Sequence, residues 1–245
     1  MSKPTTSTTS SNENKQEKTS LTTKDIQELM KQGKEKYRKL DWDKSKYPKE
    51  DGIELCSFRI EKEENILVVK VKGIFQAPIT RCFADLKNDQ FMAKQDTSII
   101  SLKKLEREID NRILPNAPAN MFTKEIIIRS MAGALTDNKD LQMVSWFWEN
   151  DKLPDKKEIL SQTLPYHEKK CFNKKKYVQI YDKFTQLKLE SVPSSNNTKT
   201  EFLYLGAWHV PGSRPGEYER KVAEILRAKY VAMAKQYAQE EKKKN

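Results

Sequence analysis

The residues best suited to nucleophilic or metal chemistry are few in this sequence of 245 residues. Its two histidines, His167 and His209, fall in a predicted loop and at a predicted strand end, and neither has a ligand-type spacing to Cys, Asp or Glu. Cys56, Cys82 and Cys171 lie far apart without a C-x-x-C pair. The sequence therefore indicates no catalytic triad, no disulfide framework and no metal site, and we expect reduced, buried thiols.

Motifs for covalent catalysis and phosphate binding are also missing from the sequence. It contains no G-x-S-x-G elbow, P-loop or G-x-G-x-x-G, and only seven glycines. The paired acids Glu63-Glu64 and Glu240-Glu241 stand in charged runs, where general acid-base catalysis is not expected. We predict that the protein is not an enzyme and needs no cofactor. A hydrolase or cyclase without a recognisable motif stays open as an alternative.

One basic segment does suggest an interaction. Residues 169–177 interleave five lysines with two aromatic side chains, and the whole chain carries a net charge of +11. Such a segment suits a phospholipid surface, because aromatic rings insert at the interface while ammonium groups meet phosphates. Nucleic acid or an acidic protein would also suit it, but no RNA-binding or DNA-binding motif is present, so we predict no specific nucleic-acid partner. We assign Lys174, Lys175 and Lys176 as candidate contacts to an anionic membrane.

Composition separates a tail from a folded region. Residues 1–21 are rich in Ser, Thr and Asn and cannot repay the entropy of ordering, so we expect a disordered tail followed by a single domain over 22–245. No apolar run approaches the roughly 18 residues of a membrane span, and no secretory signal is visible. We therefore expect a cytoplasmic protein, and a monomer.

Periodicity, caps and breakers predict the elements that must position any site. Residues 98–114 alternate weakly and fit a strand pair or a helix, of which we choose strands; 150–168 reads as a surface loop with one helical turn. The expected elements are a helix from Thr22 or Thr23 to near Leu40, strands over 53–60 and 66–75, a helix from Pro78 to near Asn88, strands within 98–114, over 125–131 and over 141–148, strands over 177–181, 186–192 and 201–208, and a helix over 217–241.

The terminal helix is the clearest of these elements. No Pro or Gly interrupts 217–241, and its apolar residues recur every three or four positions. We expect Ser213 to cap its start, with Glu217 and Glu219 at the positive end of the helix dipole. Consecutive, mostly antiparallel strands with helices at both ends predict an α+β fold in which this helix lies across a curved sheet.

At three places the sequence resembles the START family, the lipid-transfer domains related to the steroidogenic acute regulatory protein. Val71–Leu86 is similar to the family's strand running into a Pro-started helix, and Phe122–Arg129 to a segment in which a basic-acidic pair opens a strand. Gly212–Pro215 matches the G-x-x-P before its final helix. With the element order, the resemblance covers about residues 24–240.

The resemblance implies a helix-grip fold, in which a curved antiparallel sheet and the long C-terminal helix enclose one apolar tunnel for a single lipid. It implies that Val222, Leu226, Tyr230 and Met233 contact the lipid, that Trp146 and Trp148 form walls, and that Arg129 orients a polar head group. Ordinary core packing, and an exposed strand arginine, are the alternatives for these residues.

The function expected from the resemblance is therefore non-enzymatic intracellular binding or transfer of a lipid, a sterol or a phospholipid. The alternative is a START-like interaction subunit with a vestigial pocket, docked through its basic surface onto a protein assembly.

Overall fold

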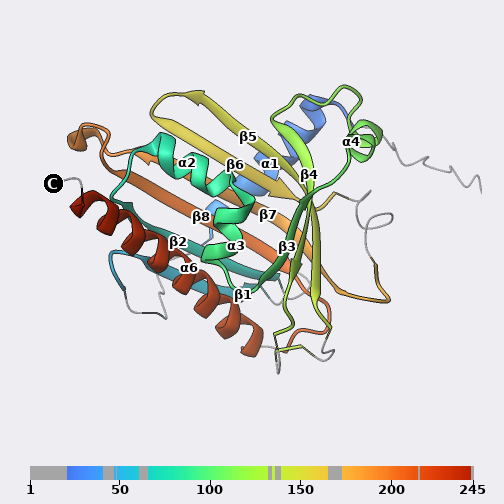
Figure 1. Cartoon of the computed structure of the whole chain (residues 1–245). Coiled ribbons are helices and arrows are strands. Elements are labelled where there is room, and N and C mark those ends of the chain that lie inside the picture. The colour runs from blue at the N-terminus through green and yellow to red at the C-terminus, as the bar shows by residue number, and fades with distance from the viewer. Residues whose placement is uncertain are drawn as a thin grey trace, which may run out of the picture.

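The computed structural model describes residues 21–40, 47, 49–60, 66–131, 134–135, 139–164, 173–214 and 216–243. In this part of the chain eight strands form one sheet, in the order β1-β2-β8-β7-β6-β5-β4-β3. The long helix α6 and the short helices α2 and α3 cover one face of the sheet, and α1 lies on the other (Figure 1). This arrangement confirms the predicted α+β class and helix-grip fold. The predicted tail, apart from Leu21, lies outside the described residues.

Neighbouring strands are antiparallel throughout the sheet. Beyond the end of β6, the first residues of β5 and β7 pair with each other in parallel. The last strand, β8, lies between β2 and β7, so the sheet brings the two halves of the chain together before α6 begins. The strands are β1 Glu54–Ile60, β2 Ile66–Phe75, β3 Ile99–Lys104, β4 Met121–Ile128, β5 Leu141–Leu153, β6 Lys156–Gln162, β7 Val178–Ser191 and β8 Thr200–His209.

Local signals explain where the helices begin. Thr22 caps α1 in a capping box: its hydroxyl accepts from the Asp25 N–H at 3.2 Å, and its own N–H donates to the Asp25 carboxylate at 2.7 Å. The helices are α1 Thr23–Arg38, α2 Ile79–Lys87, α3 Asp89–Gln95, α4 Arg107–Ile113 and α6 Glu217–Lys242, with a 3₁₀ turn η1 at Pro193–Ser195.

The predicted cap of α6 is wrong. The residue before the helix is Gly216 at φ +79°, a conformation that glycine adopts without strain. The hydroxyl of Ser213 instead accepts a hydrogen bond from the Arg59 guanidinium at 3.4 Å. The acidic residues Glu217 and Glu219 do lie in the first turn, as predicted.

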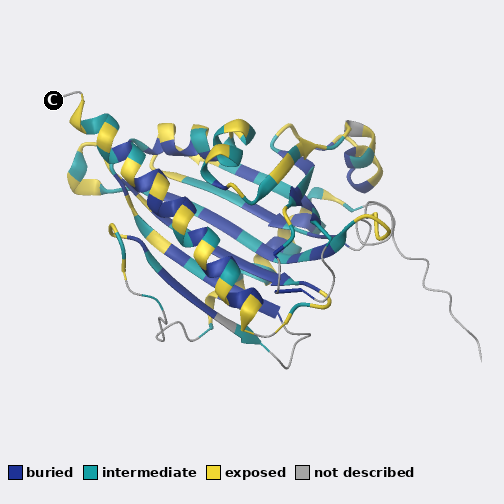
Figure 2. Ribbon diagram, turned by 60° about the horizontal axis from the view of Figure 1, so that its bottom comes forward, coloured by how far each residue is buried: buried dark blue, intermediate teal, exposed yellow. Residues whose placement is uncertain are grey.

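Two apolar cores lie on opposite faces of the sheet. Under α6, the rings of Phe75, Phe202 and Tyr230 stack, with centroids 4.2 Å apart for the first pair and 4.9 Å for the second. Under α1, Ile26 and Met30 pack with buried strand side chains. Figure 2 shows the buried side of α6 turned to the sheet and its exposed side turned away. Each core excludes water from one face, as a two-sided sheet requires.

Three predictions about local structure fail. Residues 98–114 form a strand, β3, and then the helix α4; we predicted strands for both. The predicted loop over 150–168 instead contains the end of β5 and all of β6, because strand pairing on both sides of β6 outweighs its polar composition. The two strands predicted over 177–192 are one strand, β7, with a bulge near Lys183. Helix α3 was not predicted.

Candidate functional site

A cavity of about 190 Å³ lies between the N-terminal half of α6 and the sheet. Most of its lining is apolar, and it comes from strands β3 to β8, from α6, from the connection between α3 and β3, and from Met131 after β4. The lining side chains are Asp96, Ser98, Ile99, Ile126, Ile128, Met131, Met143, Phe147, Ser161, Ile180, Thr185, Tyr204, Trp208, Tyr218, Val222, Ile225, Leu226 and Lys229.

The cavity lies under only half of α6, because aromatic side chains fill the space under the other half. Tyr237 packs edge-on against Phe75, which stacks on Phe202. Of the four helix residues proposed to contact a lipid, Val222 and Leu226 line the cavity. Tyr230 and Met233 are buried in the packed core beyond it.

The predicted tryptophan walls lie on the wrong face for this cavity. Trp146 is fully buried in the core under α1, and Trp148 packs against that same core. Phe147, between them, lines the cavity. Alternation along a strand puts successive side chains on opposite faces, so the pattern could have separated Phe147 from its neighbours, but it could not say which face belongs to α6.

The charged residues singled out from the sequence lie on the surface. Arg129 follows the end of β4, is exposed and does not line the cavity. Lys174, Lys175 and Lys176 are exposed in a turn that leads into β7. The backbone N–H of Val178 donates to the Asp140 carbonyl, which joins this turn to the start of β5, and the backbone N–H of Ser130 donates to the Asp140 carboxylate at 2.8 Å. Arg129 and the three lysines therefore lie at the same end of the sheet, near the cavity.

Sequence reasoning missed a polar group in the cavity wall. Ser161 on β6 and Thr185 on β7 line the cavity, and both donate hydrogen bonds to the fully buried carboxyl of Asp182. Burial raises the pKa of Asp182 to about 7, against the lowering effect of these hydrogen bonds. No lysine or arginine of the described residues forms an ion pair with it. Nothing in the sequence marks Ser161 and Thr185 as partners of Asp182, because only the pairing of β6 with β7 brings them together.

A second polar pair lies at the opposite wall. Lys229 on α6 and Asp96 after α3 both line the cavity and are 7% and 8% exposed. Burial lowers the pKa of Lys229, and the negative charge of Asp96 opposes that effect. Asp96 itself accepts hydrogen bonds from the backbone and hydroxyl of Ser98. The lining of the cavity is therefore mostly apolar, with these two polar groups and the tyrosines Tyr204 and Tyr218 among it.

Metal-site geometry is absent from the described residues, where no three His, Cys, Asp or Glu side chains gather as a metal site would require. His209 stacks on Tyr181 with ring centroids 5.7 Å apart, and His167 lies outside the described residues. None of the described helices combines the length and apolar composition needed to cross a bilayer.

Comparison with solved structures identifies the fold. No model of a protein family matches the sequence, and no curated protein matches it. The human StAR-related lipid transfer protein 5 matches with a TM-score of 0.66 at 13% identity, over 87% of this chain and 96% of that one. Human STARD10 matches at 0.61 and 12% identity, over 87% and 81%. The lipid transfer and protein localization domain of human StarD13 matches at 0.59 and 14% identity, over 86% and 95%. The predicted START-like fold is therefore confirmed.

Proposed function

We propose that this chain, which has the START fold, binds one lipid without converting it chemically and carries it between membranes. The observation that supports this most is the apolar cavity between α6 and the sheet. Each methylene transferred from water into such a site contributes about 0.8 kcal/mol, so an acyl chain or a sterol ring system needs no catalytic group to bind. The matched START structures include proteins named for lipid transfer, which agrees with this use.

The cavity must widen to hold a whole lipid. Its volume of about 190 Å³ is below the roughly 300 to 1,000 Å³ of typical ligand pockets. We therefore propose that a segment lining it moves on binding: the N-terminal half of α6, or the connection from Asp96 to Ser98. Val222 and Leu226 are the predicted lipid contacts that fit this site, and Phe147 replaces the two tryptophans.

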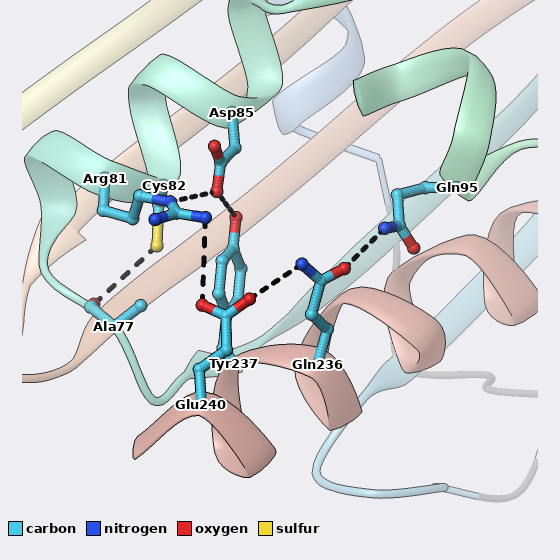
Figure 3. A network of polar contacts seen from close by, with 8 residues as sticks. All are labelled: Ala77, Arg81, Cys82, Asp85, Gln95, Gln236, Tyr237 and Glu240. Carbon is cyan, nitrogen blue, oxygen red and sulfur yellow. Dashed lines mark hydrogen bonds and ion pairs between the residues drawn. The ribbon is translucent and has the colours of Figure 1, made fainter. Parts of the chain in front are cut away.

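The C-terminal half of α6 is an unsuitable lid, because it covers the packed aromatic core and not the cavity, and polar contacts also hold it to α2 and α3 (Figure 3). Tyr237 donates to Asp85 at 3.1 Å, and Asp85 pairs with Arg81 at 2.6 Å. Gln95 donates to Gln236 at 2.7 Å. Movement confined to the cavity-lining half would leave these contacts and the aromatic stack intact.

The exposed lysines at the cavity end suggest how the protein meets a membrane. Lys174, Lys175, Lys176 and Arg129 present positive charge at the end of the sheet where the cavity lies. We propose that this end faces an anionic membrane surface during lipid uptake. The cytoplasmic location and the monomeric state stay predictions.

The first experiment is native mass spectrometry of the purified protein, followed by identification of any co-purified molecule and by uptake of fluorescent sterol and phospholipid. Leu226→Trp places a larger side chain in the cavity and is expected to weaken uptake about tenfold or more. Ala228→Trp is the matched control, because Ala228 lies on the exposed side of the same helix.

An empty protein that also takes up neither probe would contradict lipid binding and would favour the interaction subunit. Equal loss of uptake in both tryptophan variants would argue against this cavity as the site. Movement of a bound lipid between two vesicle populations separates transfer from binding alone.

A further inference from the structure

The polar part of the cavity wall is built by the bulge in β7. Residues 182 and 185 would point to opposite faces of a regular strand, since side chains alternate. The bulge between Asp182 and Phe184 adds one residue, so Asp182 lies opposite Trp208 and Thr185 lies opposite Gly206. Ser161 pairs with Thr185 across the neighbouring strand. One carboxyl and two hydroxyls therefore gather on the face that α6 covers.

When Asp182 is ionised, the hydrogen atoms of both hydroxyls are committed to its carboxylate. Ser161 donates to Asp182 Oδ2 at 2.5 Å, and Thr185 donates to Oδ1 at 2.9 Å. The backbone N–H of Asp182 donates to Thr163 Oγ1 at 3.0 Å, and the N–H of Thr163 donates to the Asp182 carbonyl at 2.7 Å, which fixes the carboxyl in place. A hydroxyl has one hydrogen and two lone pairs, so Ser161 and Thr185 keep only acceptor capacity for the cavity.

We propose that this wall, formed by Ser161 and Thr185 and oriented by Asp182, selects apolar ligands that carry a hydroxyl group. The proposal rests on the proposed lipid-binding function and names its ligand class. A ligand O–H donates to Ser161 or Thr185, which in turn donates to the carboxylate, and each bond in such a chain polarises the next. A ketone, ester or hydrocarbon of the same size has no O–H to donate, so it cannot extend this chain of hydrogen bonds. Asp182 does not line the cavity and acts as a positioning residue.

Calorimetric titration with 1-decanol and with 2-decanone tests the selectivity, at about pH 8.5 so that the Asp182 carboxyl is ionised. These compounds have the same number of carbons, but only the alcohol donates a hydrogen bond. In the unaltered protein the alcohol is expected to bind about tenfold more tightly than the ketone. Ser161→Ala and Thr185→Val should each reduce this preference. Thr123→Val is the matched control: Thr123 is buried on the α1 face, opposite Trp146, and the preference should stay unchanged.

Asp182→Asn gives the sharpest readout of positioning. The amide donates to one of the two hydroxyls, whose hydrogen then turns toward the cavity and can meet a carbonyl. The preference for the alcohol should fall or reverse in this variant. If Asp182 had only a structural role, the change would instead weaken the binding of both ligands equally. If this variant does not fold, the Ser161 and Thr185 variants still test the proposal.

Equal binding of alcohol and ketone by the unaltered protein would overturn this proposal while leaving lipid binding intact. An alcohol preference that survives the combined Ser161→Ala and Thr185→Val change would also overturn it. Failure of both compounds to bind would overturn the lipid-binding proposal, and the ligand class with it.

Discussion

At the scale of single residues, Asp182 links the cavity to stability. Its carboxyl is fully buried, and burial raises its pKa from 3.8 to about 7. Such a group opposes folding when it is charged. The native protein therefore accepts a destabilising group at the cavity wall, as functional sites often do.

The stability contribution of Asp182 should depend on pH with a defined sign. Between about pH 4 and 7 the folded state holds a proton that the unfolded state releases, so folding stability falls as pH rises. Asp182→Asn has no such titration. Its stability relative to the unaltered protein should rise across this window by more than about 1 kcal/mol, then level off above pH 7. Urea denaturation at a series of pH values measures this difference.

Glu190 supplies a control of opposite sign. Hydrogen bonding to Lys188, with the charges of Lys188 and Lys156, lowers its pKa. Its stabilising effect is present at neutral pH and is lost as pH falls through its folded pKa. The free energy of unfolding of Glu190→Gln should therefore equal that of the unaltered protein at low pH and be lower at pH 7. A flat difference for Asp182→Asn would mean that its carboxyl titrates normally.

At the scale of elements, the close contact between α1 and β7 controls how the second core packs. A Cβ at Gly33 would lie 2.6 Å from Cδ2 and 3.0 Å from Cγ of Phe184, which is fully buried. Glycine inside a helix costs about 1 kcal/mol relative to alanine, so helix propensity alone favours a change here. The near approach of Phe184 explains why glycine is suited to this position.

Gly33→Ala should lower the free energy of unfolding by about 1 to 3 kcal/mol, because overpacking outweighs the gain in helix propensity. Thermal or urea denaturation checks this. In a Phe184→Leu background the same change should cost less, since the smaller side chain gives way. An unchanged or increased melting temperature for Gly33→Ala alone would show that α1 shifts freely on the sheet.

The two halves of α6 differ in what lies beneath them. Polar contacts hold both halves, since Ser57 donates to Glu219 at 2.9 Å and Tyr237 donates to Asp85 at 3.1 Å, but only the N-terminal half lines the cavity, through residues such as Leu226. Cavities remove packing partners from the side chains around them, so the residues lining one are the least constrained part of a core.

At the scale of the whole molecule, exposed basic side chains lie at the end of the sheet where the cavity is. Replacing Lys174, Lys175 and Lys176 by Glu should weaken binding to vesicles that contain anionic lipid, since each lysine near such a surface contributes about 1 kcal/mol. Occupancy of the cavity should not change. Vesicle co-sedimentation, with lipid analysis of the same samples, measures both.

A matched variant separates position from net charge. Lys103, Lys152 and Lys199 are exposed elsewhere, and changing all three to Glu alters the total charge equally. This variant should retain more vesicle binding than the first. Equal losses would assign the effect to overall charge, and no loss in the first variant would discard the proposed membrane-facing end.

Sequence alone determined the elements whose signals are local. The capping box at Thr22 starts α1, and Pro78 precedes α2, which ends at Lys87, next to the predicted end near Asn88. The uninterrupted stripe over 217–241 marked α6 to within one residue of each end. These outcomes depend on contacts within a turn or two, so periodicity and caps suffice to predict them.

Only the tertiary structure decided which residues meet in the cavity. Strand order placed β8 between β2 and β7, and the bulge in β7 turned Asp182 toward Thr185 and Ser161. Alternation alone could not decide whether Phe147 or Trp146 faces α6, because it fixes only that they face opposite sides. Pairing between distant strands sets these positions, and its free energy comes from partners that no local stretch of sequence contains.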